Sequence, residues 1–133
     1  MRIQSSTDNA IRILQYLHIN NKGVRTAAVI SEAIGITYPF FIKIANQLKK
    51  NGLLHAEHGR NGGYRLGRPA EQISVYDVLV CTEGEIAISR CFQANHICTQ
   101  GELQHCLLRD FFCCIQEQLV SQMTQQNIAD LVA

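Results

Sequence analysis

Six cysteines, at positions 81, 91, 98, 106, 113 and 114, are the residues of this 133-residue chain best suited to metal or redox chemistry. The N-terminus carries no long apolar run, which predicts neither a signal peptide nor a membrane span and places the protein in the cytoplasm. In that reducing compartment, metal or redox work is favoured over a disulfide framework. Zinc sites favour C-x-x-C pairs, and none occurs here.

A second group of chemistry-bearing residues lies in the stretch 59–68, Gly-Arg-Asn-Gly-Gly-Tyr-Arg-Leu-Gly-Arg. Arg60, Arg65 and Arg68 put three cations on or beside a glycine-rich turn. Asn61-Gly62 is the dipeptide preferred by a two-residue primed hairpin turn, in which both central residues have positive φ. The stretch therefore predicts a basic β-hairpin suited to phosphate groups.

The charges divide between the two halves of the chain, although the formal net charge is only +1. Residues 1–70 hold ten Lys and Arg against three Asp and Glu, a net charge of +7. Residues 71–133 hold two Arg against eight acids, a net charge of −6. Chance clustering of solvated charges is the alternative, but a cationic half joined to an acidic half favours a nucleic-acid partner for the first half alone.

Three helices are expected before the hairpin. Ser6-Thr7-Asp8 offers N-caps to a first helix that ends near Asn20. Thr26 caps a second, short helix, and its expected buried side consists of Ala28, Val29, Ala33 and Ile34. Thr37 caps a third helix, with Pro39 in its first turn, and Gly52 takes the left-handed position after its end.

Two strands, Leu54–His58 and Tyr64–Leu66, should flank the glycine turn. Ser74 and Asp77 resemble a capping box that opens a short helix. Residues 82–102 have an irregular composition, and a long helix is expected over Leu103–Gln126. Its apolar positions are too many for one narrow seam, so we expect a dimerisation helix; a helix docked wholly on its own domain is the alternative.

These elements predict a mainly α protein with a small β-hairpin wing. The expected organisation is a winged helix-turn-helix domain over 1–80, a cysteine-bearing sensor loop over 81–106, and a dimerisation helix with its tail over 103–133. A helix followed by a charged hairpin is the layout of a winged helix-turn-helix, whose usual ligand is duplex DNA. The predicted DNA-binding residues are Arg2, Arg25, Thr37, Tyr38, Ile42, Lys43, Asn46, Gln47, Lys49, Lys50, Arg60, Asn61 and Arg65.

Their side chains predict different roles on DNA. Thr37, Tyr38, Ile42 and Lys43 at the N-terminal end of the third helix should reach base edges, with Asn46 and Gln47 further along. Asn and Gln can pair with adenine, Lys can donate to guanine, and Ile42 offers only apolar contact. Lys49, Lys50, Arg2 and Arg25 are expected on phosphates, which fix register without reading sequence. Arg60 at the wing tip suits a narrow minor groove. A solvated surface cation is the alternative for each Lys or Arg taken singly.

The chain resembles the Rrf2 family of bacterial winged-helix regulators over nearly its whole length. The resemblance is carried by Met1-Arg2, Asp8, Leu48-Lys49-Lys50-Asn51-Gly52-Leu53, the Gly59–Leu66 wing, Pro69 with Ile73-Ser74, and a three-cysteine segment. It implies a homodimer that binds a palindromic operator. Some branches of the family carry an iron–sulfur cluster on three cysteines per subunit, whereas others carry none.

By this resemblance, Cys91, Cys98 and Cys106 are the candidate ligands of a [2Fe-2S] or [4Fe-4S] cluster. Six and seven residues separate them, a looser spacing than in the family's sensor branches, so a protein without a cofactor is the alternative. Asp8 stands where the nitric-oxide-sensing branch has a further ligand that reaches across the dimer. Helix capping explains Asp8 equally well.

Other residues near this segment have simpler interpretations. His96 and His105 are rival ligands, although each is more often a surface histidine. One branch has a ligating histidine at the position that Arg109 occupies here. Cys81, Cys113 and Cys114 are interpreted as small buried hydrophobes.

The sequence as a whole predicts a dimeric, sequence-specific transcriptional regulator, acting as a repressor, whose operator affinity depends on an iron–sulfur cluster. One alternative is a cofactorless regulator controlled by a partner protein or a small effector. Another, from a different class, is an iron–sulfur electron-transfer or carrier protein. The sequence contains neither a nucleophile–base constellation nor a phosphate-binding loop, so we do not expect an enzyme.

Overall fold

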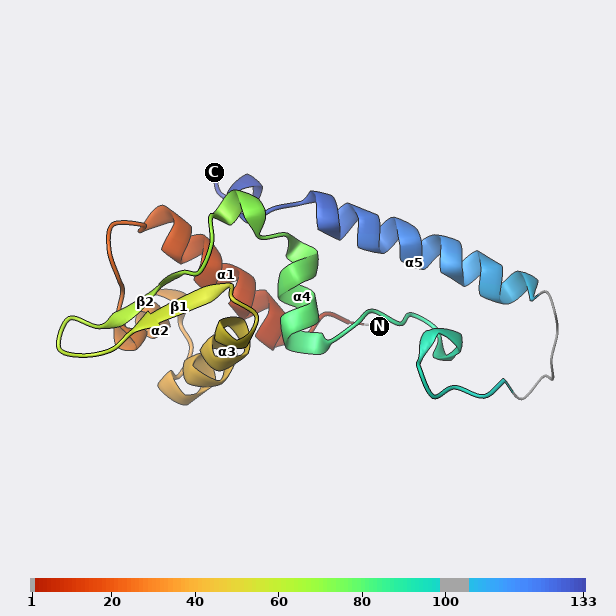
Figure 1. Ribbon diagram of the computed structural model, residues 1–133, viewed down its shortest axis with the longest axis horizontal. Helices are drawn as coiled ribbons and strands as arrows, with labels where there is room; N and C mark the ends of the chain where they lie inside the picture. Colours follow the sequence, from red (N-terminus) through yellow and green to blue (C-terminus); the bar gives the residue numbers. More distant parts are fainter. Residues whose placement is uncertain (1, 99–105) are drawn as a thin grey trace.

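The computed structural model describes residues 2–98 and 106–133, and Figure 1 shows its elongated shape. Four helices and a two-stranded hairpin form a compact head, from which a long fifth helix extends as an arm. We use "head" for residues 2–83, "cysteine segment" for residues 84–98, and "arm" for helix α5. The hairpin and the cysteine segment lie toward opposite ends of the long axis (Figure 1).

Helices α1 (Ser5–Ile19), α2 (Ala27–Ile34) and α3 (Tyr38–Lys50) form most of the core of the head. Apolar residues spaced three and four apart put one stripe of each helix inward. Phe41 of α3 is fully buried together with residues from all three helices; these include Ala10, Ile13, Leu14, Leu17, Ile30, Ile44, Ala45 and Leu48. Packing of α1 on both α2 and α3 therefore fixes the position of α3.

The N-caps predicted for α2 and α3 are confirmed. The Thr26 side chain accepts a hydrogen bond from the Val29 N–H at 3.3 Å, and Thr37 accepts one from the Phe40 N–H at 3.3 Å. Pro39 occupies the first turn of α3, and Gly52 after its end has a φ of +74°. These local signals define the helix-turn-helix.

Two expectations for the first two helices were wrong. Helix α1 begins at Ser5, and its N-cap residue Gln4 makes no side-chain cap within the described chain, so Thr7 lies inside the helix and is buried. The inward face of α2 is Ala27, Ile30, Ser31 and Ile34, whereas Val29 is 47% exposed. The helix is only two turns long, and its contacts with α1 and α3 bury a face that shares only Ile34 with the predicted one.

Strands β1 (Leu54–Glu57) and β2 (Gly63–Leu66) form the antiparallel wing. Glu57 pairs with Gly63, so the connection spans residues 58–62 and is not the predicted two-residue turn at Asn61-Gly62. The Gly62 N–H donates to the Gly59 carbonyl at 3.1 Å, and neither Asn61 nor Gly62 is among the described residues with positive φ. A side chain at Gly62 would collide with the Glu57 carbonyl, which explains why glycine is needed there.

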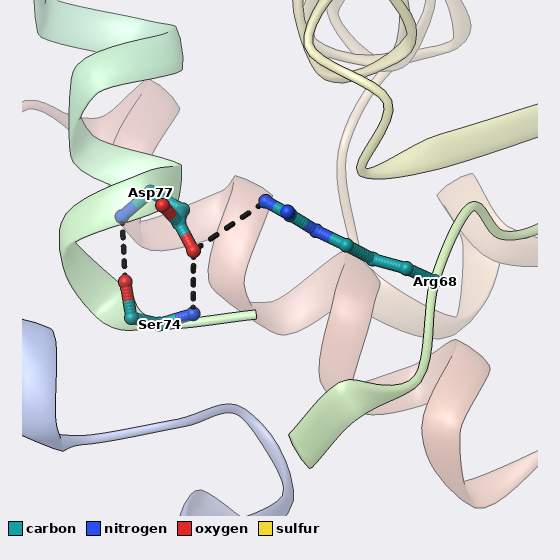
Figure 2. A network of polar contacts seen from close by, with 3 residues as sticks. All are labelled: Arg68, Ser74 and Asp77. Atoms are coloured by element: carbon teal, nitrogen blue, oxygen red, sulfur yellow. Dashed lines mark hydrogen bonds and ion pairs between the residues drawn. The ribbon is translucent and has the colours of Figure 1, made fainter. Parts of the chain in front are cut away.

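A short 3₁₀ turn, η1 (Ala70–Gln72), leads into α4 (Val75–Glu83). The predicted capping box is confirmed: the Asp77 N–H donates to Ser74 Oγ at 3.0 Å, and the Ser74 N–H donates to Asp77 Oδ2 at 2.9 Å. Figure 2 shows that the same carboxylate oxygen also faces Arg68, whose Nη2 lies 3.4 Å away. This contact ties the residues after the wing to the start of α4.

Beyond α4 lie the turn η2 (Arg90–Phe92), the arm α5 (Leu107–Gln125) and the turn η3 (Ala129–Leu131). Leu103, the predicted start of the long helix, lies outside the described residues, and the described helix begins after Cys106. The chain returns to the head after α5: Ile128 is fully buried, and its N–H donates to the Ile73 carbonyl at 2.9 Å. The arm is thus anchored at its C-terminal end.

No single described helix is long and apolar enough to cross a membrane. Helices α2 and α3 reach that length and apolarity only when taken together, and they are bent by 108° at the break between them. In the head most of their apolar residues belong to the core described above, whereas Val29 is exposed.

Candidate DNA interface and cysteine segment

Helix α3 presents most of the predicted base-reading residues to solvent. Tyr38 is 56% exposed at the N-terminal end of the helix. The other exposed predicted residues of this element are Thr37, Lys43, Asn46, Lys49 and Lys50. Because Phe41, Ile44 and Leu48 are buried on the opposite face, the helix lies on the head with a polar side free to enter a groove.

Two predicted contact residues of α3 are less free. Ile42 is half-buried and packs against the core. Gln47 is also half-buried, and its side-chain oxygen is buried without a hydrogen-bond partner in the described part of the chain. These two residues lie where the exposed side of α3 meets the head, so they border the candidate reading surface.

The three arginines on and beside the wing differ in their ion pairs. Arg65 forms an ion pair with Glu57 across the hairpin, with Nε and Oε1 3.0 Å apart, and Arg68 is held by Asp77. Arg60 and Asn61 lie exposed on the connection between the strands. Arg60 is therefore the wing cation best placed for a phosphate or a minor groove.

Arg25 attaches the wing to the helix-turn-helix through its backbone. Its N–H donates to the Tyr64 carbonyl at 2.9 Å, and its carbonyl accepts from the Tyr64 N–H at 2.7 Å. A side chain at Gly63 would approach the Arg25 carbonyl to 2.6 Å, so glycine permits this close pairing. The Arg25 side chain is partly buried, and its Nε has no hydrogen-bond partner within residues 2–98 and 106–133.

Tyr64 is a residue that the sequence analysis did not single out. Its ring packs edge-on against Phe41, with centroids 5.2 Å apart, and so joins the wing to α3. Burial and the nearby Tyr38 hydroxyl raise the pKa of Tyr64. The signal for this role was its place in the Gly-Gly-Tyr-Arg-Leu run, between the close-packed Gly63 and the outward Arg65.

A hydrogen bond and a cation–π contact join the cysteine segment to the arm. The Ile88 N–H donates to Gln116 Oε1 at 3.0 Å, and the Arg109 guanidinium lies 5.7 Å from the centre of the Phe92 ring. Cys91, next to Phe92, is half-buried, and Cys98 is exposed. Cys106 is the residue immediately before α5.

The six thiols are free, but the structure does not gather three of them. Among the described residues, no three His, Cys, Asp or Glu side chains lie close enough together to hold a metal ion. The donor set of Cys91, Cys98 and Cys106 is chemically suited to iron, whereas its arrangement in a single chain is not that of an assembled site. His96 is exposed, and His105 lies outside the described residues.

The remaining candidate groups have local roles. Asp8 is paired with Arg12 along α1, with Oδ2 and Nε 3.2 Å apart, and both side chains are more than half exposed. Burial and the Asp77 carboxylate raise the pKa of Cys81 to about 11, as befits a thiol packed against the core. Cys113 is half-buried and Cys114 is exposed, so the interpretation of Cys114 as a buried hydrophobe was wrong.

The family model for Rrf2, described as an iron-dependent transcriptional regulator, matches residues 3–133. The chain belongs to the Rrf2 family. It is also 38% identical over 97 residues to Protein aau3 of Rhizobium meliloti strain 1021, a match that covers 73% of this chain and 63% of that protein. This Rrf2 chain thus spans somewhat less than two thirds of that relative.

Solved structures of Rrf2 regulators share the fold. CymR of B. subtilis, a global cysteine regulator, superposes with a TM-score of 0.80 and 18% identity, covering 98% of this chain and 95% of that one. IscR of T. potens gives a TM-score of 0.76 and 17% identity, covering 98% and 85%. The oxidised form of Staphylococcus aureus CymR gives 0.73 and 19%, covering 98% and 95%. This Rrf2 chain therefore has the winged-helix fold of the solved regulators.

Proposed function

We propose that this Rrf2 protein acts in the cytoplasm as a homodimeric repressor that binds a palindromic operator. A signal received at its cysteines changes its affinity for that operator. The observation that carries the DNA-binding part is the pairing of an exposed α3 face with a wing held against it by Tyr64 and Arg25. A two-fold dimer would place two α3 helices about 34 Å apart, one helical turn of DNA.

The arm supports the dimer. None of the nineteen residues of α5 is buried in the single chain. Large apolar side chains gather at its N-terminal half, where Leu107, Leu108 and Phe111 are 75%, 64% and 59% exposed. An apolar helix face of this kind is usually covered by a partner, and a second copy of the same helix supplies a matching face.

For the signal, we propose that Cys91, Cys98 and Cys106 hold an iron–sulfur cluster, with Asp8 of the other subunit as a further candidate ligand. Such a group supplies sensitivity to oxidants, nitric oxide or iron supply when bound. The support is the free thiol set before the arm and membership of a family described as iron-dependent. Because Phe92 and Ile88 contact the arm, a change of ligation at these cysteines can alter how α5 sits on the head.

A second candidate function is a cofactorless regulator whose thiols or a small effector carry the signal. The ungathered cysteines favour it, as does the fold likeness to CymR, a cysteine regulator. An iron–sulfur carrier is disfavoured because it has no use for the exposed α3 face and wing.

Chemical analysis separates these candidates. The protein is purified without oxygen, and iron, acid-labile sulfide and the visible absorption spectrum are measured for the wild type and for Cys98→Ala. Cluster binding predicts iron and sulfide in similar amounts with charge-transfer bands in the wild type, and loss of both in the variant. A colourless, iron-free wild type that still binds a duplex selected from a randomised pool would establish the cofactorless regulator instead.

A further inference from the structure

A partly buried polar contact joins the first turn of α1 to the last turn of α4. Thr7 is fully buried, and its hydroxyl donates to Glu83 Oε2 at 2.5 Å. The Thr82 hydroxyl lies 2.6 Å from the Thr7 hydroxyl. A hydroxyl has one hydrogen, so when Thr7 donates to Glu83, Thr82 is the donor in its contact with Thr7, in competition with its bond to the Val78 carbonyl at 3.2 Å. Thr7 is thus satisfied entirely by residues of another helix.

Glu83 also completes the N-terminus of α1. Gln4, the N-cap residue, provides no side-chain cap of its own in the described chain, and its N–H points to Glu83 Oε1 at 3.4 Å. The free N–H groups and the positive end of the helix dipole favour a carboxylate at this place. A residue about eighty positions away therefore supplies what the local sequence of α1 lacks.

The position of Glu83 gives this contact a second consequence. Glu83 is the last residue of α4, and Gly84, with a φ of +83°, begins the cysteine segment. Four residues later, Ile88 is hydrogen-bonded to Gln116 of the arm, and Phe92 beside Cys91 packs under Arg109. Continuous contacts therefore run from α1 through Glu83 and the cysteine segment to α5.

Helix α1 carries the other end of this connection. Ile13, Leu14 and Leu17 of α1 are buried in the same core as Phe41 and Leu48 of α3. A packed core transmits a shift of one helix to its neighbours because it contains few voids. A change in the anchoring of the α1 N-terminus thus reaches the helix that reads DNA.

We propose that Thr7 and Glu83 are positioning residues that couple the cysteine segment to the DNA-binding head, an inference that rests on operator binding by the head but not on the nature of the signal. The coupling is reciprocal: if a change in the cysteine segment alters operator binding at α3, operator binding alters the cysteine segment by the same coupling free energy. Neither residue contacts DNA in this account. Removing either side chain should uncouple the cysteine segment from the head, while operator binding and the chemistry of the cysteines remain.

Reciprocity allows a test that needs no knowledge of the signal. Amide hydrogen exchange of residues 84–92 is measured with and without a duplex that the wild-type protein has selected from a randomised pool. The wild type is expected to exchange more slowly in this stretch when the duplex is bound. Thr7→Val, which keeps the buried shape but removes the hydroxyl, is expected to lose this slowing while still binding the duplex.

Matched variants separate coupling from simple destabilisation. Thr7→Ser restores the hydroxyl and should restore the slowing, and Glu83→Gln should diminish it even if Thr7→Val does not fold. Thr124→Val is the control, because within the described residues the Thr124 hydroxyl bonds only to the Val120 carbonyl of its own helix, at 2.7 Å. Operator-dependent slowing that is absent from the wild type, or equal in wild type, Thr7→Val and Glu83→Gln, would overturn the proposal. A protein without iron and sulfide would refute the cluster, but the hydrogen-exchange comparison would still test the coupling.

Discussion

The head and the arm of this Rrf2 protein differ in how fully a single chain buries their apolar residues and pairs their polar groups. The head contains a continuous core around Phe41, its helices α2 to α4 begin with side-chain caps, and its wing is paired along its length. The arm has no buried residue of its own and ends next to cysteines that are not gathered. A single chain thus completes the candidate DNA interface, whereas the arm and the proposed sensor cysteines need a partner or a ligand to be completed.

The largest expected effect comes from removing one phenylalanine side chain from the head and comparing it with the same change in the arm. Phe41→Ala deletes a fully buried ring that touches Tyr64, so we expect unfolding free energy to fall by about 3–5 kcal/mol. Phe111→Ala removes a ring that is 59% exposed, and we expect the monomer to lose less than about 0.5 kcal/mol. Urea denaturation at low protein concentration measures both; equal losses would contradict the division.

The exposed face of the arm predicts an effect on assembly instead of folding. Leu108→Glu puts a charge where we propose a symmetric contact, and both copies lose an apolar group worth about 1.5–3 kcal/mol each. The dimer should therefore weaken roughly a hundredfold or more, as measured by sedimentation equilibrium. Gln118→Glu, at another exposed position of α5, is the matched control and should leave the dimer intact. A dimer unaffected by Leu108→Glu would place the subunit contact elsewhere.

Thiol reactivity should also separate the head from the cysteine segment. Burial and Asp77 raise the pKa of Cys81 to about 11, so at neutral pH its reactive thiolate is roughly a hundredfold scarcer than for an ordinary thiol. The raised pKa favours the protonated form, and alkylation of Cys81 should therefore accelerate only as the pH rises toward that value. Mass spectrometry after brief iodoacetamide treatment of iron-free protein should find exposed Cys98 modified well before Cys81. The reverse order would mean that the core around Cys81 opens readily.

The smallest expected effects distinguish the wing arginines. Arg60→Ala removes an exposed cation proposed to contact DNA, so operator affinity should fall and its dependence on salt should weaken by about one phosphate contact. Arg68→Ala breaks a partly exposed ion pair with Asp77 and should cost less than about 1 kcal/mol of stability with little change in the salt dependence. Fluorescence titration at several salt concentrations measures the first effect and denaturation the second. Identical salt slopes for wild type and Arg60→Ala would remove the wing tip from the interface.

The parts of the fold that the sequence predicted are those determined by neighbouring residues. Thr26, Thr37 and the Ser74–Asp77 box mark helix starts through bonds that span three residues, so a single segment contains the whole signal. The wing followed from glycine and strand patterns, although its turn type depended on the pairing of Glu57 with Gly63. The outward face of α3 followed from its apolar spacing.

What could not be predicted depends on contacts between distant segments. The N-terminus of α1 is completed by Glu83, and Ile128 enters the core from beyond the arm. Arg65 was predicted to bind DNA, and the sequence did not show that the fold pairs it with Glu57, or that it pairs the neighbouring Arg68 with Asp77. For Cys91, Cys98 and Cys106, spacing along the chain cannot state whether three thiols meet in space.

The most direct test of the central claim compares operator affinity for one preparation of the protein before and after removal of its iron. Binding of the selected duplex is measured without oxygen at a single salt concentration, with Cys98→Ala carried through the same treatment. We predict that the wild type changes its affinity when the iron is removed and that Cys98→Ala binds with the same affinity throughout. Equal wild-type affinity in both states would contradict regulation through an iron–sulfur cluster.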